Sequence, residues 1–213
     1  MELIWLGHSC MRLRSRDTII IQDPFDRSLG YHIGRWTADV VTVSHDHPGH
    51  NNVSAVQGNP KVLRGPGEYD IGPASIIGIS TFHDKQRGKE RGRNIVFAVE
   101  MDDVRVCHLG DIGEVPTTEM VKAIGAVDVL LLPVGGSTTI DAQGALETVN
   151  LFEPKVIVPI HYQTPALQRQ DLAGVEQFLQ MMAIAHPTPV PRLNVTASNL
   201  PSEPQVVLLE YTT

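Results

Sequence analysis

Short apolar runs, many of them rich in valine and isoleucine, recur along the whole chain and predict a protein built mainly from β-strands. Glycine, proline, aspartate or asparagine bounds most of these runs, which is typical of strands that end in turns. The ten predicted strands span residues 2–6, 18–22, 40–43, 61–63, 75–80, 94–100, 104–109, 128–134, 155–160 and 205–211. Apolar spacing of three and four residues predicts helices over residues 118–124, 142–152 and 170–183. Thr117 and Asp141, directly before the first two helices, are predicted to cap them.

The order of these elements indicates an α/β fold in which sheets pack on one another and helices lie outside. Strands outnumber helices and do not alternate with them as they do in βαβ units. The chain has 213 residues and shows no internal repeat, low-complexity segment or linker. We therefore expect a single domain that spans residues 1–213.

Composition and the N-terminal sequence indicate in which cellular compartment the protein is expected. The chain has no apolar run of eighteen residues, so no membrane span is predicted. Residues 1–8 lack the basic region and the cleavage site of a secretory signal. Cys10 and Cys107 do not make a disulfide framework, and we expect buried free thiols. These features predict a cytoplasmic protein.

Three of the nine histidines lie within six residues, directly after the predicted strand 40–43. Residues 44–50 read Ser-His-Asp-His-Pro-Gly-His, which places His45, His47 and His50 in the spacing His-x-His-x-x-His. Neutral imidazole is a common ligand of zinc, and a strand that ends in this pattern delivers several imidazoles to one place. The alternative is a histidine-rich surface turn, but imidazoles this close would repel one another once protonated. The pattern therefore predicts a metal site.

Three further predicted strands lead into a residue that can bind a metal. These residues are His83, Asp111 and His161. The C-terminal ends of strands in helix-covered sheets are where loops assemble binding sites. One such residue alone would more often be structural, but three of them beside the histidine cluster indicate a shared site.

Five short motifs accompany these features: Trp-Leu-Gly-His-Ser-Cys at residues 5–10, Asp-Pro-Phe at 23–25, Gly-Pro-Gly-Glu-Tyr-Asp-Ile-Gly at 65–72, Leu-Pro-Val-Gly-Gly at 132–136 and Pro-Ile-His-Tyr at 159–162. With them the chain resembles the metallo-β-lactamase superfamily, and within it the compact bacterial hydrolases related to ascorbate-6-phosphate lactonase. The resemblance implies a four-layer αβ/βα sandwich with the metals at one edge, between the two sheets.

The resemblance also implies a set of metal ligands. Those of the first metal are His45, His47 and His83, those of the second are His50 and His161, and the carboxylate that bridges both is Asp111. The expected cofactor is one or two divalent transition metals, with Zn as the first choice and Mn, Fe or Ni as alternatives.

Further residues are expected beside the ligands. Asp23, Asp46 or Asp84 could accept a hydrogen bond from a ligating imidazole, and His8 could face the site from the first strand. Asp23 could instead cap a strand, and His108 is expected to be packed rather than ligating.

Gly49 departs from the family pattern His-x-His-x-Asp-His. The aspartate of that pattern binds the second metal and helps to orient the attacking water, whereas glycine offers no side-chain ligand. His50, Asp111 and His161 remain, and three protein ligands plus water can still make a catalytic zinc site. We expect either two metals with a weakened second site or one metal, and we expect Gly49→Asp to raise the occupancy of the second site.

These expectations predict a metal-dependent hydrolase. Hydroxide would form on the metal, which lowers the pKa of bound water from about 16 to about 7, and would attack a carbonyl or phosphorus atom, with Asp111 and His50 as the catalytic residues. The formal net charge of −7 argues against nucleic acid as a partner. Residues 83–94 nevertheless carry five of the seventeen cationic residues. Within this segment Arg87, Arg91 and Arg93 are predicted to bind a small anionic substrate, a lactone or other acyl ester or a phosphodiester, unless the segment is a solvated loop.

Two other functions stay open. A degraded second site, for which Gly49 is the only support, would leave a non-catalytic protein that binds a metal or ligand. A nuclease would share these ligands, but the chain is short and acidic and has no inserted domain to hold a polymer. Assembly into a homo-oligomer is an expectation by analogy.

Overall fold

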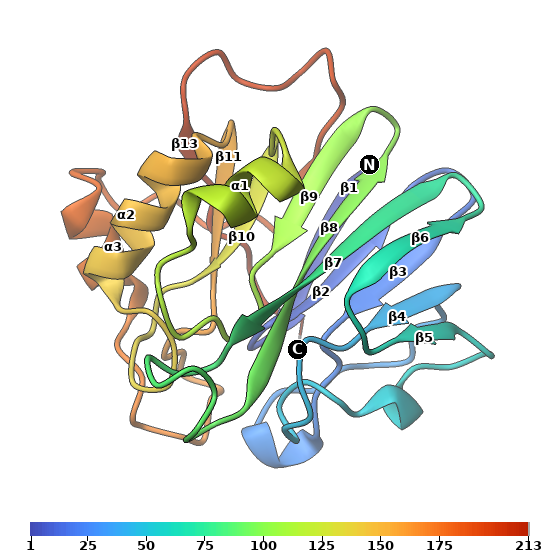
Figure 1. Cartoon of the computed structure of the whole chain (residues 1–213), viewed down its shortest axis with the longest axis horizontal. Coiled ribbons are helices and arrows are strands. Elements are labelled where there is room, and N and C mark those ends of the chain that lie inside the picture. The colour runs from blue at the N-terminus through green and yellow to red at the C-terminus, as the bar shows by residue number, and fades with distance from the viewer. Residues whose placement is uncertain (213) are drawn as a thin grey trace.

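Two β-sheets pack face to face at the centre of the computed structural model, which describes residues 1–212 (Figure 1). Thr213, the last residue of the predicted domain, lies outside the described residues. The first sheet has the strand order β12 (Leu193–Asn194), β1 (Glu2–Gly7), β2 (Cys10–Arg14), β3 (Ile19–Gln22), β4 (Val40–Thr42) and β5 (Lys61–Leu63). The second sheet has the order β13 (Gln205–Val206), β11 (Val156–Ile160), β10 (Val129–Pro133), β9 (Val104–His108), β8 (Arg93–Met101), β7 (Ala74–Phe82) and β6 (Gly67–Ile71).

Alternation along the strands of the first sheet divides their side chains between two apolar clusters. Trp5 and Ile20 belong to the large core that the two sheets share. Leu6 and Ile21, their neighbours in sequence, belong to a smaller cluster on the other face. This is the expected result of the two-residue period of a strand, and it shows that both faces of the first sheet are covered.

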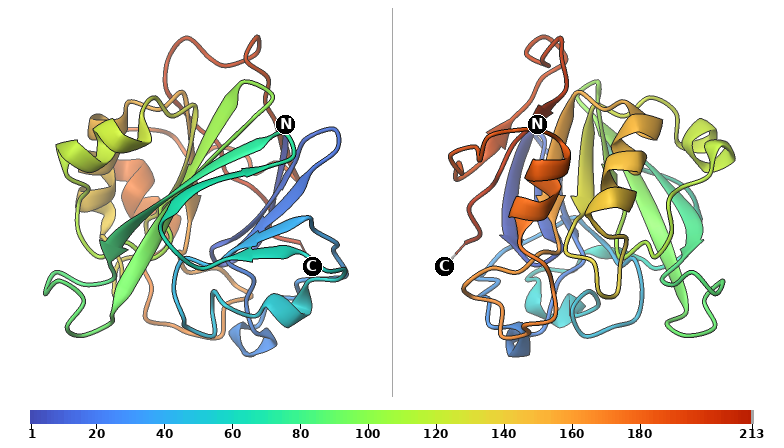
Figure 2. Two further views of the ribbon diagram at one scale, coloured as in Figure 1. Left: turned by 45° about the vertical axis from the view of Figure 1, so that its right-hand side comes forward. Right: turned by 90° about the vertical axis from the view of Figure 1, so that its left-hand side faces the viewer.

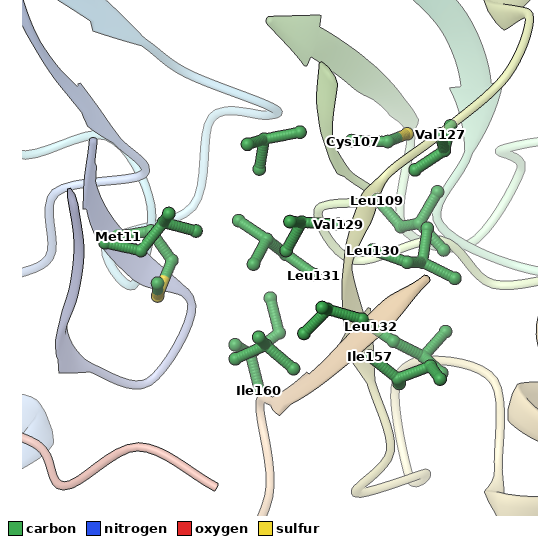
Figure 3. Close-up of a cluster of buried hydrophobic side chains, with 14 of the residues drawn as sticks. Met11, Cys107, Leu109, Val127, Val129, Leu130, Leu131, Leu132, Ile157 and Ile160 are labelled. Atoms are coloured by element: carbon green, nitrogen blue, oxygen red, sulfur yellow. The ribbon is translucent and has the colours of Figure 1, made fainter. Parts of the chain in front are cut away.

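The central strands of the second sheet are buried on both faces. All five residues of β10 are buried, and β10 pairs in parallel with β9 and β11. Continuous apolar runs of this kind are typical of parallel strands that are covered on both sides. Figure 3 shows Met11 of the first sheet pointing toward the side chains of β10 and β11.

The helices α1 (Thr118–Ile124) and α2 (Ala142–Phe152) lie over the outer face of the second sheet, and α3 (Val175–Met181) packs beside α2 (Figure 2). The outer face of the first sheet is covered by the 3₁₀ helices η1 (Arg27–Leu29) and η2 (Val53–Ala55) and by loops that contribute Leu167 and Leu172. The predicted α/β sandwich of two sheets with outer layers is confirmed, although the outer layer on the first sheet contains 3₁₀ turns and loops. No helix within residues 1–212 combines the length and the apolar character that crossing a membrane requires.

Strand predictions failed where the local pattern was weak. Strand β2 was missed because its sequence, Cys-Met-Arg-Leu-Arg, carries two charges. In the structure Arg12 is nevertheless buried, where it forms an ion pair with Glu2 at 3.2 Å and lies over the ring of Trp36. Edge strand β6 was missed because it is polar and largely exposed. The predicted strand 205–211 is only two residues long as β13, and beyond it Leu209 and Tyr211 form isolated bridges.

Helix predictions were more accurate. Thr117 and Asp141 cap α1 and α2, since their side chains accept hydrogen bonds from the backbone N–H groups of Met120 and Gly144. The predicted helix 170–183 begins later, after Gly174, because the residues before it form an irregular loop. Cys10 and Cys107 are buried free thiols, as predicted.

Candidate metal centre

Strand direction brings the predicted site residues to one edge of the sandwich. In the first sheet β1, β3 and β4 run the same way, and in the second sheet β7, β9 and β11 do. Each of these six strands is followed within three residues by a site residue: His8, Asp23, His45, His83, Asp111 and His161, in that order. The carboxyl ends of parallel strands share an edge, so residues far apart in the sequence can meet there.

One carboxylate oxygen lies at the centre of the cluster. Oδ2 of Asp111 is 3.2 Å from Nε2 of His50 and 3.2 Å from Nε2 of His161. Nε2 of His83 lies 3.4 Å from the same oxygen, and Nε2 of His45 lies 3.8 Å from it. All five residues are buried. A carboxylate shared by two metal ions would need imidazoles placed around it in this way.

The imidazoles form two groups. In each group, one possible ligand atom of every residue lies within 4.8 Å of the others; the groups are His45, His47 and His83, and His8, His50 and His161. The first group contains the three residues expected to bind the first metal. The second contains both histidines expected to bind the second metal, together with His8.

Asp23 orients His50 directly and His45 through Ser44. Nδ1 of His50 lies 2.9 Å from the Asp23 carboxylate, so it can donate to it while Nε2 faces Asp111. The backbone N–H of Ser44 donates to Asp23 at 2.7 Å, and the Ser44 hydroxyl also donates to it. The Ser44 oxygen lies 2.9 Å from Nδ1 of His45, which can donate to it and leave its Nε2 free. Imidazoles that bind metals commonly have such partners on the other ring nitrogen.

Asn94 and His108 hold the turn that carries Asp111. Asn94 is fully buried, and its Oδ1 accepts a hydrogen bond from the backbone N–H of Asp111 at 3.0 Å. Nδ1 of His108 accepts from the N–H of Gly110, and Nε2 donates to the carbonyl of Ser9, so both ring nitrogens are occupied. Gly110 has φ 58°, and a Cβ there would lie 2.4 Å from Oδ1 of Asn94, which only glycine avoids. Asn94 could not be identified from the sequence, because one asparagine at the start of a strand suggests no role.

Three site residues have a backbone conformation that is rare in residues with a side chain. The φ angles of His8, Asp23 and His161 are 52°, 47° and 50°. Each residue directly follows the last residue of a strand. Left-handed conformations of this kind cost about 1–3 kcal/mol each and are concentrated at functional sites.

Burial and neighbouring charges set the protonation of the cluster. Burial acts to raise the pKa of Asp111, but His161 and His50 outweigh it and hold that pKa well below its ordinary value. Burial acts to lower the pKa of His50, but Asp111 and Asp23 raise it to about 10. Burial lowers the pKa of His45 to about 2 and that of His83 to about 4. At neutral pH the site therefore holds an ionised carboxylate and several neutral imidazoles, the forms that bind metals.

Several buried polar atoms of the cluster have no hydrogen-bond partner among the described residues. They are Nδ1 of His8, Nε2 of His45, Nδ1 of His83, Oδ1 of Asp111 and both ring nitrogens of His161. Buried polar atoms are normally paired, so this concentration needs an explanation. Imidazole nitrogen and carboxylate oxygen together suit Zn, Mn, Fe or Ni. The residues therefore fit a divalent transition metal.

The expectation that Asp46 lies against a ligand is wrong. Its side chain is 87% exposed, and it accepts a hydrogen bond from Asn51 at 2.6 Å instead of from an imidazole. Asp46 stands between His45 and His47, whose rings point into the cluster, so the chain turns the intervening carboxylate to solvent.

Asp84 fastens the basic loop of residues 85–92 that follows His83. Its carboxylate accepts hydrogen bonds from the backbone N–H groups of Gln86, Gly88, Glu90 and Arg91, at 2.7, 2.9, 3.1 and 2.8 Å. One buried carboxylate therefore orders the loop and holds it beside the cluster.

Two pockets lie next to the cluster, and two of the three predicted substrate-binding arginines line one pocket each. His45, Arg64 and Arg93 line a pocket of about 440 Å³, and His83 and Arg91 line one of about 340 Å³. Arg87 is exposed on the loop and lines neither pocket. Arg64 was missed by the sequence analysis, because it follows a different strand, β5, and only the pairing of β5 with β4 brings it near His45.

The two-sheet sandwich with a histidine and aspartate cluster at its strand ends defines a class of metal-binding proteins. The family model of the β-lactamase superfamily domain matches residues 2–161, a span that includes every predicted ligand, and the chain belongs to this family.

Relatives and solved structures agree with this assignment. A crystal structure from Thermotoga maritima, described as that of a candidate Zn-dependent hydrolase of the metallo-β-lactamase superfamily, is 39% identical with a TM-score of 0.81, and the alignment covers 99% of each chain. A UPF0173 metal-dependent hydrolase from Methanoculleus marisnigri is 30% identical over 207 residues, which cover 84% of this chain and 89% of the relative. Another, from Thermoplasma acidophilum, is 28% identical over 197 residues, which cover 80% of this chain and 87% of the relative. The predicted family is confirmed, and the predicted enzyme class agrees with the names of these relatives.

Proposed function

We propose that this protein is a metal-dependent hydrolase of small anionic substrates. The observation that carries the proposal is the convergence of four imidazole nitrogens within 3.2–3.8 Å of one oxygen of Asp111. The names of the relatives support the hydrolase class. Zn is the first choice of metal, because the donors are mainly imidazoles and a similar solved structure is described as a candidate Zn-dependent hydrolase.

The roles of the residues follow from their positions. His45, His47 and His83 would hold one ion, His50 and His161 a second, and Asp111 would contact both. A divalent ion in such a site lowers the pKa of bound water to about 7 and stabilises negative charge that develops on a substrate oxygen. The protein itself keeps Asp111 ionised and His45 and His83 neutral, orients His45 and His50 through Asp23, and excludes bulk water by burial.

An anionic substrate is supported by the charges beside the cluster. Arg64 and Arg93 line the pocket next to His45, although the whole chain carries a formal net charge of −7. Arginine binds planar anions such as carboxylate and phosphate through two parallel hydrogen bonds. A lactone or other acyl ester that carries such a group and a phosphodiester both meet this requirement.

The test is metal content together with activity. We expect protein purified without chelator to contain one or two transition-metal ions per chain and to hydrolyse members of a panel of anionic lactones, acyl esters and phosphodiesters. Asp111→Asn and His45→Ala should reduce the rate by about 100-fold or more while the circular dichroism spectrum stays unchanged. His32→Ala, at an exposed histidine, is the matched control. Protein that takes up neither Zn nor Mn would refute the proposal.

A further inference from the structure

The ring of His8 lies directly against the point where a side chain at position 49 would begin. A Cβ built on Gly49 would be 3.1 Å from Nε2 of His8 and 3.3 Å from its Cδ2. His8 follows β1 and Gly49 follows β4, so only the tertiary structure brings them together. The position that holds an aspartate in the family pattern is thus adjacent to an imidazole supplied by another strand.

His8 has the surroundings of a ligand. It is 1% exposed, and its ring centroid lies 4.3 Å from that of His161 and 5.1 Å from that of His50. One possible ligand nitrogen from each of these three residues lies within 4.8 Å of the others. Nδ1 of His8 is buried and has no hydrogen-bond partner among the described residues.

The backbone is built to present this side chain. A bulge between Trp5 and Gly7 ends the regular pairing of β1 with β2, and His8 then adopts a left-handed conformation. Its carbonyl accepts two hydrogen bonds, from the indole Nε1 of Trp5 at 2.9 Å and from the backbone N–H of His161 at 3.0 Å. Gly7 has φ 114°, and a Cβ there would lie 2.6 Å from the ring of Tyr31, so residue 7 must be glycine. The backbone of His8 is therefore fixed in place by contacts with both sheets.

We propose that His8 is a protein ligand of the second metal ion and replaces the aspartate that Gly49 lacks. The inference rests on the proposed function, because it assigns a ligand to the same metal centre. The second site then has the donors His8, His50, His161 and Asp111, which is a sufficient set for Zn. A neutral imidazole in place of a carboxylate makes the site one unit more positive, which favours an anionic substrate. It also favours Zn, Fe or Ni over harder ions, since imidazole suits these metals.

This assignment changes the prediction for Gly49→Asp. From the sequence, that substitution alone was expected to raise the occupancy of the second site. With the ring of His8 beside position 49, we expect the substitution alone to bring no gain, because the new side chain and the imidazole compete for the same space. In the double variant His8→Ala/Gly49→Asp the carboxylate has room, and we expect it to restore the site.

The experiment compares wild type, His8→Ala, His8→Gln, Gly49→Asp and the double variant, with His32→Ala as the control. Zinc per chain is measured by elemental analysis, and the dissociation constant of each ion is measured by titrating the metal-free full chain with Co(II). We expect two ions in the wild type, a second ion at least about 10-fold weaker in both His8 variants, and recovery in the double variant. His8→Gln keeps a polar side chain of similar reach and covers the case in which His8→Ala fails to fold.

Two results would overturn the inference alone. One is a second ion that binds the His8 variants as tightly as it binds the wild type. The other is a loss in His8→Ala that Gly49→Asp does not restore. A wild type without any bound transition metal would overturn the proposed function first, so the two failures can be told apart.

Discussion

At the scale of single residues, Asp23 contacts one of the expected ligands directly and a second through Ser44, without being an expected ligand itself. One carboxylate accepts hydrogen bonds from Ser44 and lies 2.9 Å from Nδ1 of His50, so it fixes two imidazoles at once. Burial acts to raise the pKa of Asp23, but the hydrogen bond with His50 helps to lower it overall, so the carboxylate is ionised at neutral pH.

Asp23→Asn is expected to weaken metal binding by about 10- to 100-fold, because the amide cannot accept the hydrogen bonds of Ser44 and His50 as the carboxylate does. The measurement is the dissociation constant for Zn by competition with a chromophoric chelator. Asp46→Asn is the matched control, since Asp46 adjoins His45 in the sequence but its side chain faces solvent. Equal affinities for the two variants would show that Asp23 does not orient the ligands.

The candidate ligands could be predicted from the sequence better than the residues that contact them. His45, His50, His83, Asp111 and His161 were found because each follows an apolar strand, and the structure brings them together. Their roles as ligands stay predictions until metal is measured. Asp46 was misjudged because neighbours in a sequence can point in opposite directions, and only the backbone conformation decides which one enters the cluster.

At the scale of elements, the loop of residues 85–92 depends on Asp84. Four backbone N–H groups of the loop donate to its carboxylate, and no strand or helix lies within the loop. The loop carries Lys85, Arg87, Lys89 and Arg91, so trypsin can cleave it wherever it opens.

Asp84→Ala is expected to free the loop. Each hydrogen bond to a charged group contributes about 1.5–3 kcal/mol, so losing four should raise the rate of tryptic cleavage in residues 85–91 by about tenfold or more. Cleavage is followed by mass spectrometry of the fragments. Glu90→Ala, an exposed acid in the same loop, should leave the rate near that of wild type. Unchanged cleavage in Asp84→Ala would mean that other contacts hold the loop.

Elements with strong periodicity were predicted well, and elements that depend on distant partners were not. The helices α1 and α2 carry their own caps and apolar spacing, so local sequence suffices. Strand β2 carries the buried Arg12, whose charge is balanced by the ion pair with Glu2 and by the contact with the ring of Trp36. Strand β6 is stabilised by antiparallel pairing with β7 along five residues.

At the scale of the whole molecule, enclosing so many imidazoles makes folding of the metal-free protein depend on pH. The pKa of His45 is lowered to about 2 and that of His83 to about 4, against an ordinary value of 6.5. Below pH 6.5 the unfolded chain binds protons that these folded imidazoles do not, so stability rises with pH between about pH 4 and 6.5. His50, with a pKa of about 10, is protonated in both states over most of this range and contributes little to the change.

We therefore expect the free energy of unfolding of metal-free protein to fall as the pH is lowered from about 6.5 to about 4.5, with about 2 kcal/mol of the loss due to His45 alone. Urea titrations at the two pH values measure it. His45→Gln should show a smaller fall than wild type, whereas His32→Gln should match wild type. The same fall in all three proteins would assign the effect to other groups.

The sequence by itself determined the class of fold, the family and the donor atoms available for a metal. These follow from local information, since apolar alternation predicts strands and each motif names its own side chains. Only the tertiary structure decided that Asn94 holds the backbone of Asp111, that Arg64 lines the pocket beside His45, and that His8 lies against Gly49. Those contacts join residues separated by seventeen or more positions, and their distances depend on strand pairing, on a bulge and on backbone conformations that no local pattern specifies.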